Sequence, residues 1–581
     1  MKACRIWAGA AAGLVWMAAV STVELSGQTI IMEFDRPIVL RDGTRLSADI
    51  YRPRSDQAVP VIVQRTPYDN NADSYFGEFF AEQGYAFVTV DARGRYDSDG
   101  NFYPYWDDGR DGYDVIQWAS EQPWSDGEVG TLGGSYLGFN QWLAARELPP
   151  ALKTMAVIVA PVDYYDSPAH TGGAFNLGGR LPWGVLVDGR TNQNLAIHDW
   201  DRALRHLPLV TADSAIGRDL PHFRDWVENA EKNEYWERFG LGLRWNDLDI
   251  SVYHIGGWYD EFLRGTLAGF VHMREASGSH QNLLIGPWTH NVLGADGKAG
   301  DIDFGAESVV DFRTDLLQWF DRHLREVPTV GVDESPVRVF VMGSNSWQQF
   351  SAWPPVEARA QKFYLHSDGH ANSLDGDGFL DTTEPGDEAA DRFRYDPAIP
   401  VPTVGGGTCC VAPGLYPEIM KWGPQDQREV EKRSDVLVFT SVALEDPIMV
   451  VGPIRVRLFA ASSAVDTDFT AKLVDVFPDG YAMNLTDGII RARYRESFAQ
   501  PSLMAPGEVY EFDVDLAATA NTFQRGHRIR LEISSSNFPW YDRNLNTGGH
   551  PAYDTELRTA DQLILHDRDH PSHILLPILK Q

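Results

Sequence analysis

The chain has 581 residues, of which 23% are charged and 43% hydrophobic, so it is a globular protein that is too long for a single core. Its formal net charge of −32 argues against a nucleic-acid partner, because phosphate binding draws on clustered lysine and arginine, and it also disfavours anionic membrane surfaces. We read the acidity as a source of solubility.

The first 28 residues have the layout of a secretory signal peptide. Lys2 and Arg5 precede an uncharged apolar run over 6–23, and small polar residues follow it. This predicts a secreted or periplasmic protein with no stable membrane span after cleavage. The alternative is an uncleaved anchor, since the run is near the lower length limit for crossing a bilayer.

A hairpin followed by short apolar strands is expected next. Residues 30–51 alternate apolar and polar side chains around a turn at 41–43, which indicates an antiparallel hairpin. Continuous apolar runs separated by helical segments then predict a parallel sheet with both faces covered. These runs lie at 59–64, 85–91, 130–133, 155–160, 250–255 and 282–285. We assign 29–160 and 250–330 to an α/β core.

One turn in this core presents a serine. Ser135 follows Gly133 and Gly134, and a helix-compatible segment continues over 139–147. Small residues beside a serine let a strand reverse sharply into a helix, as in the Gly-x-Ser-x-Gly nucleophile elbow of α/β-hydrolases. The second glycine stands one position late, at Gly138. By itself the pattern is weak, because glycine-rich turns that contain serine are common.

Two later strand ends supply the acid and the base that a serine nucleophile requires. Asp260 comes just after the run 250–255, and His290 comes just after 282–285. The chain order Ser, Asp, His is that of α/β-hydrolases. His290 would take the proton of Ser135, and Asp260 would hold the imidazole in the required tautomer. The sequence therefore predicts a catalytic triad of Ser135, Asp260 and His290.

Two other segments differ from the core. Between 161 and 249 strand signals stop and aromatic, helix-compatible stretches take over, so we expect a helical cap over the carboxyl edge of the sheet. From 331 to 581 alternating strands separated by Gly, Pro and Asp turns predict an all-β sandwich or jelly roll. We place such strands at 337–341, 362–365, 454–459, 509–514 and 529–533.

We expect no metal and no cofactor. The acidic turns at 97–100 and 375–378 lack the glutamate that completes a calcium loop, and no histidine or cysteine spacing suggests zinc. Cys409 and Cys410 are the only cysteines after the predicted signal peptide. As sequence neighbours they are either loop thiols or a vicinal bridge.

Several motifs together resemble those of the CocE/NonD hydrolases, including the delayed glycine. They are Gly133-Gly134-Ser135-Tyr136-Leu137-Gly138, Gly257-Trp258-Tyr259-Asp260, Gly286-Pro287-Trp288-Thr289-His290, Arg65-Thr66-Pro67-Tyr68, Asp91-Ala92-Arg93-Gly94-Arg95 and Asp466-Thr467-Asp468-Phe469. The resemblance runs from about Glu33 to the C-terminus. It implies an α/β-hydrolase core with a helical cap insertion, a C-terminal jelly roll, and an oxyanion hole formed by the Tyr136 N–H and the Tyr68 hydroxyl.

The resemblance also bears on the substrate. The α-amino-acid ester hydrolases of this family carry acidic residues two and three places after the catalytic aspartate, where this chain has Phe262 and Leu263, and Glu261 is a weak substitute. We expect an exported serine hydrolase that cleaves a small-molecule ester or amide through an acyl-enzyme, as a monomer or a homo-oligomer. The alternatives are an Xaa-Pro dipeptidyl-peptidase and a catalytically inactive carbohydrate-binding protein.

Overall fold

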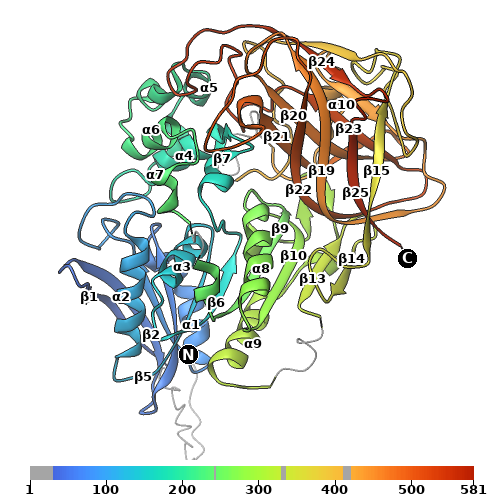
Figure 1. Cartoon of the computed structure of the whole chain (residues 1–581). Helices are drawn as coiled ribbons and strands as arrows, with labels where there is room; N and C mark the ends of the chain where they lie inside the picture. The colour runs from blue at the N-terminus through green and yellow to red at the C-terminus, as the bar shows by residue number, and fades with distance from the viewer. Residues whose placement is uncertain (1–29, 241–243, 329–334, 410–420, 581) are drawn as a thin grey trace, which may run out of the picture.

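The computed structural model describes residues 30–240, 244–328, 335–409 and 421–580. The predicted signal peptide lies outside these residues. Two large sheets dominate the described chain, one of ten strands and one of eleven, and the C-terminal sheet lies beside the carboxyl edge of the first (Figure 1). No helix among the described residues is long and apolar enough to cross a membrane.

The ten-stranded sheet confirms the predicted hairpin and parallel core. Its order is β1-β2-β4-β3-β5-β6-β9-β10-β13-β14, and neighbours from β4 to β13 are parallel. The strands are β1 (Ile30–Val39), β2 (Arg45–Pro53), β3 (Val59–Thr66), β4 (Ala86–Asp91), β5 (Ser125–Gly134), β6 (Leu152–Ile158), β9 (Ser251–Tyr259), β10 (Gln281–Thr289), β13 (Val337–Val341) and β14 (Ser346–Phe350).

Helices cover both faces of this sheet, as continuous apolar strands require. On β3, Val61 and Val63 join the cluster that contains residues of α2 (Asp108–Ser120) and α3 (Tyr136–Arg146). The residue between them, Ile62, joins the opposite cluster with α1 (Ser74–Glu82) and α9 (Phe312–Leu324). A further helix, α8 (Leu263–Ala276), follows β9.

The assignment of 337–341 to the C-terminal sheet is wrong. β13 pairs in parallel with β10, and β14 closes the same sheet in antiparallel fashion. Val337, Val339, Phe340 and Val341 are all buried, as in a strand with both faces covered. Arg338 gave the strand an alternating appearance, but its guanidinium lies over the Trp347 ring on the neighbouring strand.

Short helices fill the segment between β6 and β9 and group together in Figure 1. They are η2 (Tyr165–Ala169), α4 (Leu177–Leu186), η3 (Leu195–Ile197), α5 (Trp200–Leu204), η4 (Leu209–Thr211), η5 (Ser214–Ile216), α6 (Pro221–Glu228), α7 (Glu234–Glu237) and η6 (Arg244–Asp247), with the two-residue strands β7 (His170–Thr171) and β8 (Ala174–Phe175). Several of the aromatic residues noted in the sequence, such as Trp183, Trp226 and Trp236, form its core.

The C-terminal part is built mostly of β-strands, as predicted. Its sheet consists of β15 (Ala358–His366), β16 (Phe379–Asp381), β17 (Asp391–Tyr395), β18 (Leu437–Thr440), β19 (Ile448–Ser462), β20 (Asp468–Val476), β21 (Ala482–Arg491), β22 (Tyr510–Phe523), β23 (Arg528–Ser534), β24 (Ala560–Leu565) and β25 (His573–Leu579). The short helix α10 (Arg428–Glu431) lies between β17 and β18 in the sequence. The smaller elements are η1 (Asn70–Asp73), η7 (Val292–Gly294), β11 (Lys298–Ala299), β12 (Ile302–Asp303), η8 (Ala306–Ser308) and η9 (Ala492–Tyr494). Cys409 is buried and disulfide-bonded, and Cys410 lies outside the described residues.

The two sheets share a continuous core. One hydrophobic cluster contains Phe270 of α8, Val339 of β13 and Leu516 of β22. Arg264 of α8 pairs with the Asp515 carboxylate at 2.6 Å and donates a second hydrogen bond to the Asp515 carbonyl at 2.7 Å. The C-terminal sheet therefore packs directly against the elements that follow β9.

Candidate active site

Ser135 lies in the turn between β5 and α3, at the carboxyl edge of the first sheet. Its φ of 58° and ψ of −121° are rare for a residue other than glycine and cost roughly 1–3 kcal/mol. A Cβ at Gly133 would lie 2.5 Å from that of Leu137, and one at Gly138 would lie 2.6 Å from that of Ala160. Both glycines therefore allow close packing at the turn, and the late position of the second one is explained by its contact with Ala160.

Tyr68 reaches the same edge from the loop after β3. Its N–H donates to Thr66 Oγ1 at 3.0 Å, and the buried Arg95 donates to the Pro67 carbonyl at 2.7 Å. The rings of Tyr68 and Tyr136 lie edge to face with centroids 6.2 Å apart. These contacts anchor the backbone just before Tyr68, and the Tyr136 ring packs against its side chain.

A buried network anchors the first turn of α3. The Tyr136 hydroxyl donates to Asp108 at 2.5 Å, Arg65 pairs with the same carboxylate at 3.0 Å, and the Asn140 amide donates to the Arg65 carbonyl at 2.8 Å. As the first residue of a helix, Tyr136 has a backbone N–H with no acceptor inside the helix. The network holds this N–H next to Ser135.

Asp260 and His290 each follow the last residue of a parallel strand, β9 and β10 respectively. His290 Nδ1 lies 2.7 Å from Asp260 Oδ1, and the other Asp260 oxygen accepts the Phe262 N–H at 3.1 Å. Asp260 is buried and His290 is partly exposed. An imidazole held through Nδ1 keeps Nε2 free to face a nucleophile.

The electrostatics around His290 favour the imidazolium. Burial opposes the positive charge, but the charge and hydrogen bond of Asp260, with the charge of Glu261, outweigh it and raise the pKa of His290 above 6.5. The Phe262 ring packs against the imidazole, with centroids 5.3 Å apart. The base is therefore poised to accept a proton.

Comparisons with known proteins cover nearly the whole chain. Residues 42–292 match the model of the X-Pro dipeptidyl-peptidase (S15 family), and 330–575 match that of the X-Pro dipeptidyl-peptidase C-terminal non-catalytic domain. Cocaine esterase from Rhodococcus sp. (strain MB1 Bresler) is 40% identical over 573 residues, which cover 94% of this chain and 98% of that protein. The chain belongs to the CocE/NonD family of hydrolases.

Solved structures agree with this CocE/NonD membership. An aminopeptidase from the marine sediment archaeon Thaumarchaeota archaeon has a TM-score of 0.85 at 26% identity, covering 95% of this chain and 97% of that one. An α-amino acid ester hydrolase has a TM-score of 0.84 at 26% identity, covering 96% and 100%. Like the esterases and peptidases of this family, the chain is a serine hydrolase with an α/β-hydrolase-type fold and a mostly β C-terminal domain.

The predicted site residues of this CocE/NonD hydrolase share one sheet edge. β5, β6, β9 and β10 are parallel neighbours, and Gly134, Ile158, Ile255 and Leu284 stand in one row across them. Ser135, Asp260 and His290 all follow this row toward the carboxyl ends. The sequence analysis did not predict roles for Arg180 and Trp183 of α4. The segment between β6 and β9 has no regular pattern that shows which of its side chains face the carboxyl edge of the sheet.

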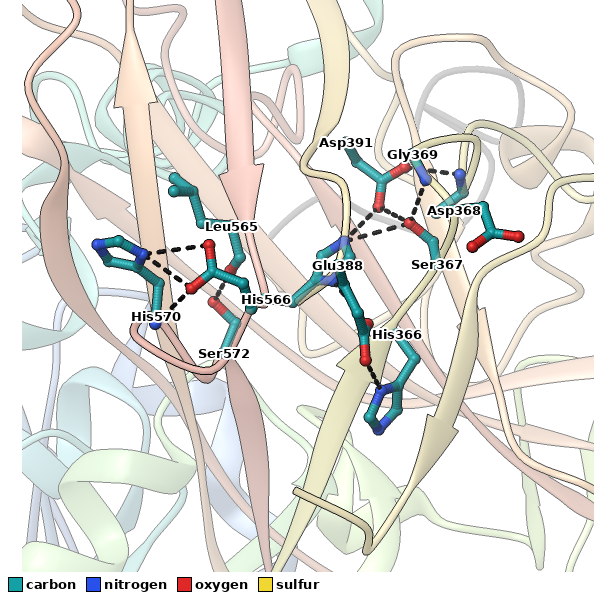
Figure 2. Close-up of polar contacts among 12 residues, drawn as sticks. His366, Ser367, Asp368, Gly369, Glu388, Asp391, Leu565, His566, His570 and Ser572 are labelled. Carbon is teal, nitrogen blue, oxygen red and sulfur yellow. Dashed lines mark hydrogen bonds and ion pairs between the residues drawn. The ribbon is translucent and has the colours of Figure 1, made fainter. Parts of the chain in front are cut away.

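The C-terminal domain contains a second group of serine, histidine and carboxylates (Figure 2). His566 Nε2 lies 3.2 Å from Ser367 Oγ, and its Nδ1 lies 3.2 Å from Glu388. However, Ser367 donates its hydroxyl to Asp391 at 2.7 Å and is only 8% exposed. Since His566 Nε2 also meets Asp391 at 3.0 Å, the group is a buried imidazole between two carboxylates rather than a second nucleophilic centre.

We expect His566→Gln to destabilise the protein by about 3 kcal/mol near pH 6, because one partner of a buried charged pair is removed. Burial opposes the charge, but Asp391 and Glu388 raise the pKa of His566 above its ordinary value. The stabilisation is therefore complete below the unfolded value of about 6.5 and declines as the pH rises through the folded pKa. Chemical denaturation of both proteins across this range measures the difference.

The matched control for this prediction is His570→Gln in the same loop. Its imidazole is 34% exposed and pairs with Asp567 at 3.0 Å, so its loss should cost less than about 1 kcal/mol. A difference between His566→Gln and the parent that stays constant or grows with rising pH would contradict the charged imidazole.

Proposed function

We propose that this protein is an exported serine esterase with Ser135 as nucleophile, His290 as general base and Asp260 as the orienting acid. The observation that carries the proposal is the 2.7 Å hydrogen bond between His290 and Asp260 at the sheet edge where the turn after β5 presents Ser135. His290 Nε2 removes the Ser135 proton as Oγ attacks the ester carbonyl carbon, and then returns it to the leaving alcohol. A water repeats the cycle on the acyl-enzyme.

Two donors stabilise the oxyanion in this mechanism, the Tyr136 N–H and the Tyr68 hydroxyl. Burial raises the pKa of Tyr68 to about 12, although a hydrogen bond from Trp183 opposes the rise, so the phenol keeps its proton at working pH. Trp183 Nε1 donates to Tyr68 Oη at 2.8 Å. Because the indole N–H can only donate, Tyr68 accepts this bond and does not use its own proton in it, so that proton can be offered to the substrate.

We expect Tyr68→Phe to lower kcat by about 100-fold to 1,000-fold, because one oxyanion donor is lost while the aromatic ring is kept. KM for a short acyl ester should change much less, since the donor acts mainly on the developing charge. Steady-state kinetics on p-nitrophenyl acetate measure both. A kcat within about threefold of the parent would remove Tyr68 from the oxyanion hole.

The substrate we propose is an ester without a free amino group beside the reacting carbonyl. Phe262 and Leu263 are apolar and buried, and the neighbouring carboxylate, Glu261, has both oxygens 2.9 Å from Arg180. No carboxylate is thus left at these three positions to bind a substrate ammonium. The 40% identity to cocaine esterase supports an ester, whereas the similar structures are an α-amino acid ester hydrolase and an aminopeptidase.

The remaining parts receive the roles that the family resemblance implies. Residues 161–249 form a cap that shapes the pocket, residues after β14 form a jelly roll, and residues 1–28 direct export. Trp183 and Arg180 of the segment between β6 and β9 contact Tyr68 and Glu261, which supports the assignment of a cap. N-terminal sequencing of the protein from the culture medium or periplasm tests the export and the cleavage.

A substrate panel separates this proposal from its rivals. The mature protein is assayed on short acyl esters, α-amino-acid esters, a Gly-Pro anilide and the corresponding simple amides. We expect turnover of the uncharged esters to exceed that of the other substrates. Preference for the Gly-Pro anilide would instead indicate a dipeptidyl-peptidase, and no turnover together with carbohydrate binding would indicate the inactive binding protein.

A further inference from the structure

A buried ion pair joins the segment between β6 and β9 to the loop that carries Asp260. Both Glu261 oxygens lie 2.9 Å from Arg180 Nη2, and each side chain is 2% exposed. Asn176, the N-cap of α4, donates to Glu261 at 3.4 Å, and Arg180 donates to the Tyr164 hydroxyl at 3.3 Å. Ion pairs this deeply buried are costly unless further hydrogen bonds satisfy their polar atoms. Asn176 and Tyr164 supply two such bonds, whereas Arg180 Nε has no hydrogen-bond partner among the described residues.

Each member of this pair is close in sequence to a residue of the proposed catalytic machinery. Glu261 directly follows Asp260, so one short stretch of backbone holds His290 on one side and Arg180 on the other. Trp183 lies three residues after Arg180, on the same side of α4. The Arg180 guanidinium lies 5.6 Å from the centre of the Trp183 ring, and Trp183 donates to Tyr68. The contacts thus run from the general base to the oxyanion donor.

We propose that Arg180 and Glu261 are positioning residues: they hold the Tyr68 hydroxyl and the His290 imidazole in their relative positions, and their opposite charges offset each other at the imidazole. This inference deepens the proposed function and rests on it. Neither residue needs to touch the substrate. Arg180 acts through Trp183 on the Tyr68 hydroxyl, and Glu261 acts on His290 through the shared backbone and through its charge.

Among the described residues, Asp260, Glu261 and Arg180 carry the charges that act most strongly on His290. Asp260 and Glu261 belong to the segment between β9 and α8, Arg180 comes from α4, and the Phe262 ring covers one side of the imidazole. Glu261 raises the pKa of His290, and Arg180 lowers it. Since arginine stays protonated in proteins, removing the carboxylate alone leaves an uncompensated positive charge near the base.

The test compares Glu261→Gln, the double variant Arg180→Gln/Glu261→Gln and the parent protein. The pH dependence of kcat/KM for p-nitrophenyl acetate is measured for each, together with its thermal midpoint, so that all assays are made on folded protein. Glu261→Gln should lower kcat about 10-fold to 100-fold with a smaller change in KM, because the shared loop loses its anchor. The acid limb of its pH profile, where activity falls as His290 becomes protonated, should move to lower pH in Glu261→Gln. The acid limb of the double variant should lie between those of Glu261→Gln and the parent.

A purely structural role predicts a different pattern. Activity would then fall with the thermal midpoint in both variants, while the acid limb stayed in place. An unmoved limb, or a limb displaced to higher pH in Glu261→Gln, overturns the inference. The proposed function fails separately, if the parent protein shows no hydrolysis that depends on Ser135.

Discussion

Replacing Ser135 by alanine is expected to reduce ester hydrolysis by about 10⁴-fold to 10⁶-fold, because the nucleophile is removed while the oxyanion donors remain. The residual rate would be that of water attacking an ester held by Tyr68 and the Tyr136 N–H. The measurement is kcat on a chromogenic ester, with the far-ultraviolet circular dichroism of the variant as a check of its fold.

Ser135→Gly is the matched control for stability. Ser135 has φ 58° and ψ −121°, a region that glycine adopts readily. The glycine variant should therefore be as inactive as the alanine variant but more stable than it by about 1 kcal/mol. If either variant kept more than about a tenth of the parent kcat, another nucleophile would have to carry the reaction.

Asp260→Asn is expected to lower kcat by about 10⁴-fold, because an amide side chain can present its N–H to the imidazole and stabilise the wrong tautomer. The pH profile gives a second readout. The base must be neutral to act, so activity in the parent falls as the pH drops through the pKa of His290, which Asp260 raises despite burial. Without the carboxylate this acid limb should move to lower pH.

The control for Asp260→Asn is a carboxylate outside the site. Asp321 pairs with Arg325 at 3.1 Å on α9, on the opposite face of the sheet from α3, so Asp321→Asn should leave both kcat and the pH profile unchanged. An Asp260→Asn variant that loses less than about tenfold in kcat would show that Asp260 does not orient the base.

The parallel core and the placement of Asp260 and His290 at its strand ends could be predicted from the sequence for a physical reason. Parallel strands covered on both faces are short apolar runs, so a carboxylate at Asp260 and an imidazole at His290, each shortly after such a run, were recognisable. Strand ends of one parallel sheet share an edge, and the structure places both residues there with Ser135. Their catalytic roles remain predictions that the variants above test.

Local sequence patterns did not reveal the roles of Arg180 and Glu261, because these depend on contacts between segments that are distant in the sequence. The start of α4 is fixed by the C-terminal domain, where Asp542 accepts the Phe175 N–H at 2.7 Å and the Trp540 carbonyl accepts the Gly178 N–H at 3.2 Å. Nothing in the sequence near Arg180 indicates those partners. Glu261 looked like a weak ammonium site, and only the fold brings Arg180 to it.

The most direct test of the account is to trap the acyl-enzyme. The parent protein is mixed with excess p-nitrophenyl ester, quenched within one turnover and digested for mass spectrometry. We expect one acyl group per chain on the peptide that contains Ser135, with a burst of p-nitrophenol that matches the enzyme concentration if deacylation is the slower step. An acyl group on a different residue, or its persistence in Ser135→Ala at the parent level, would contradict the central claim.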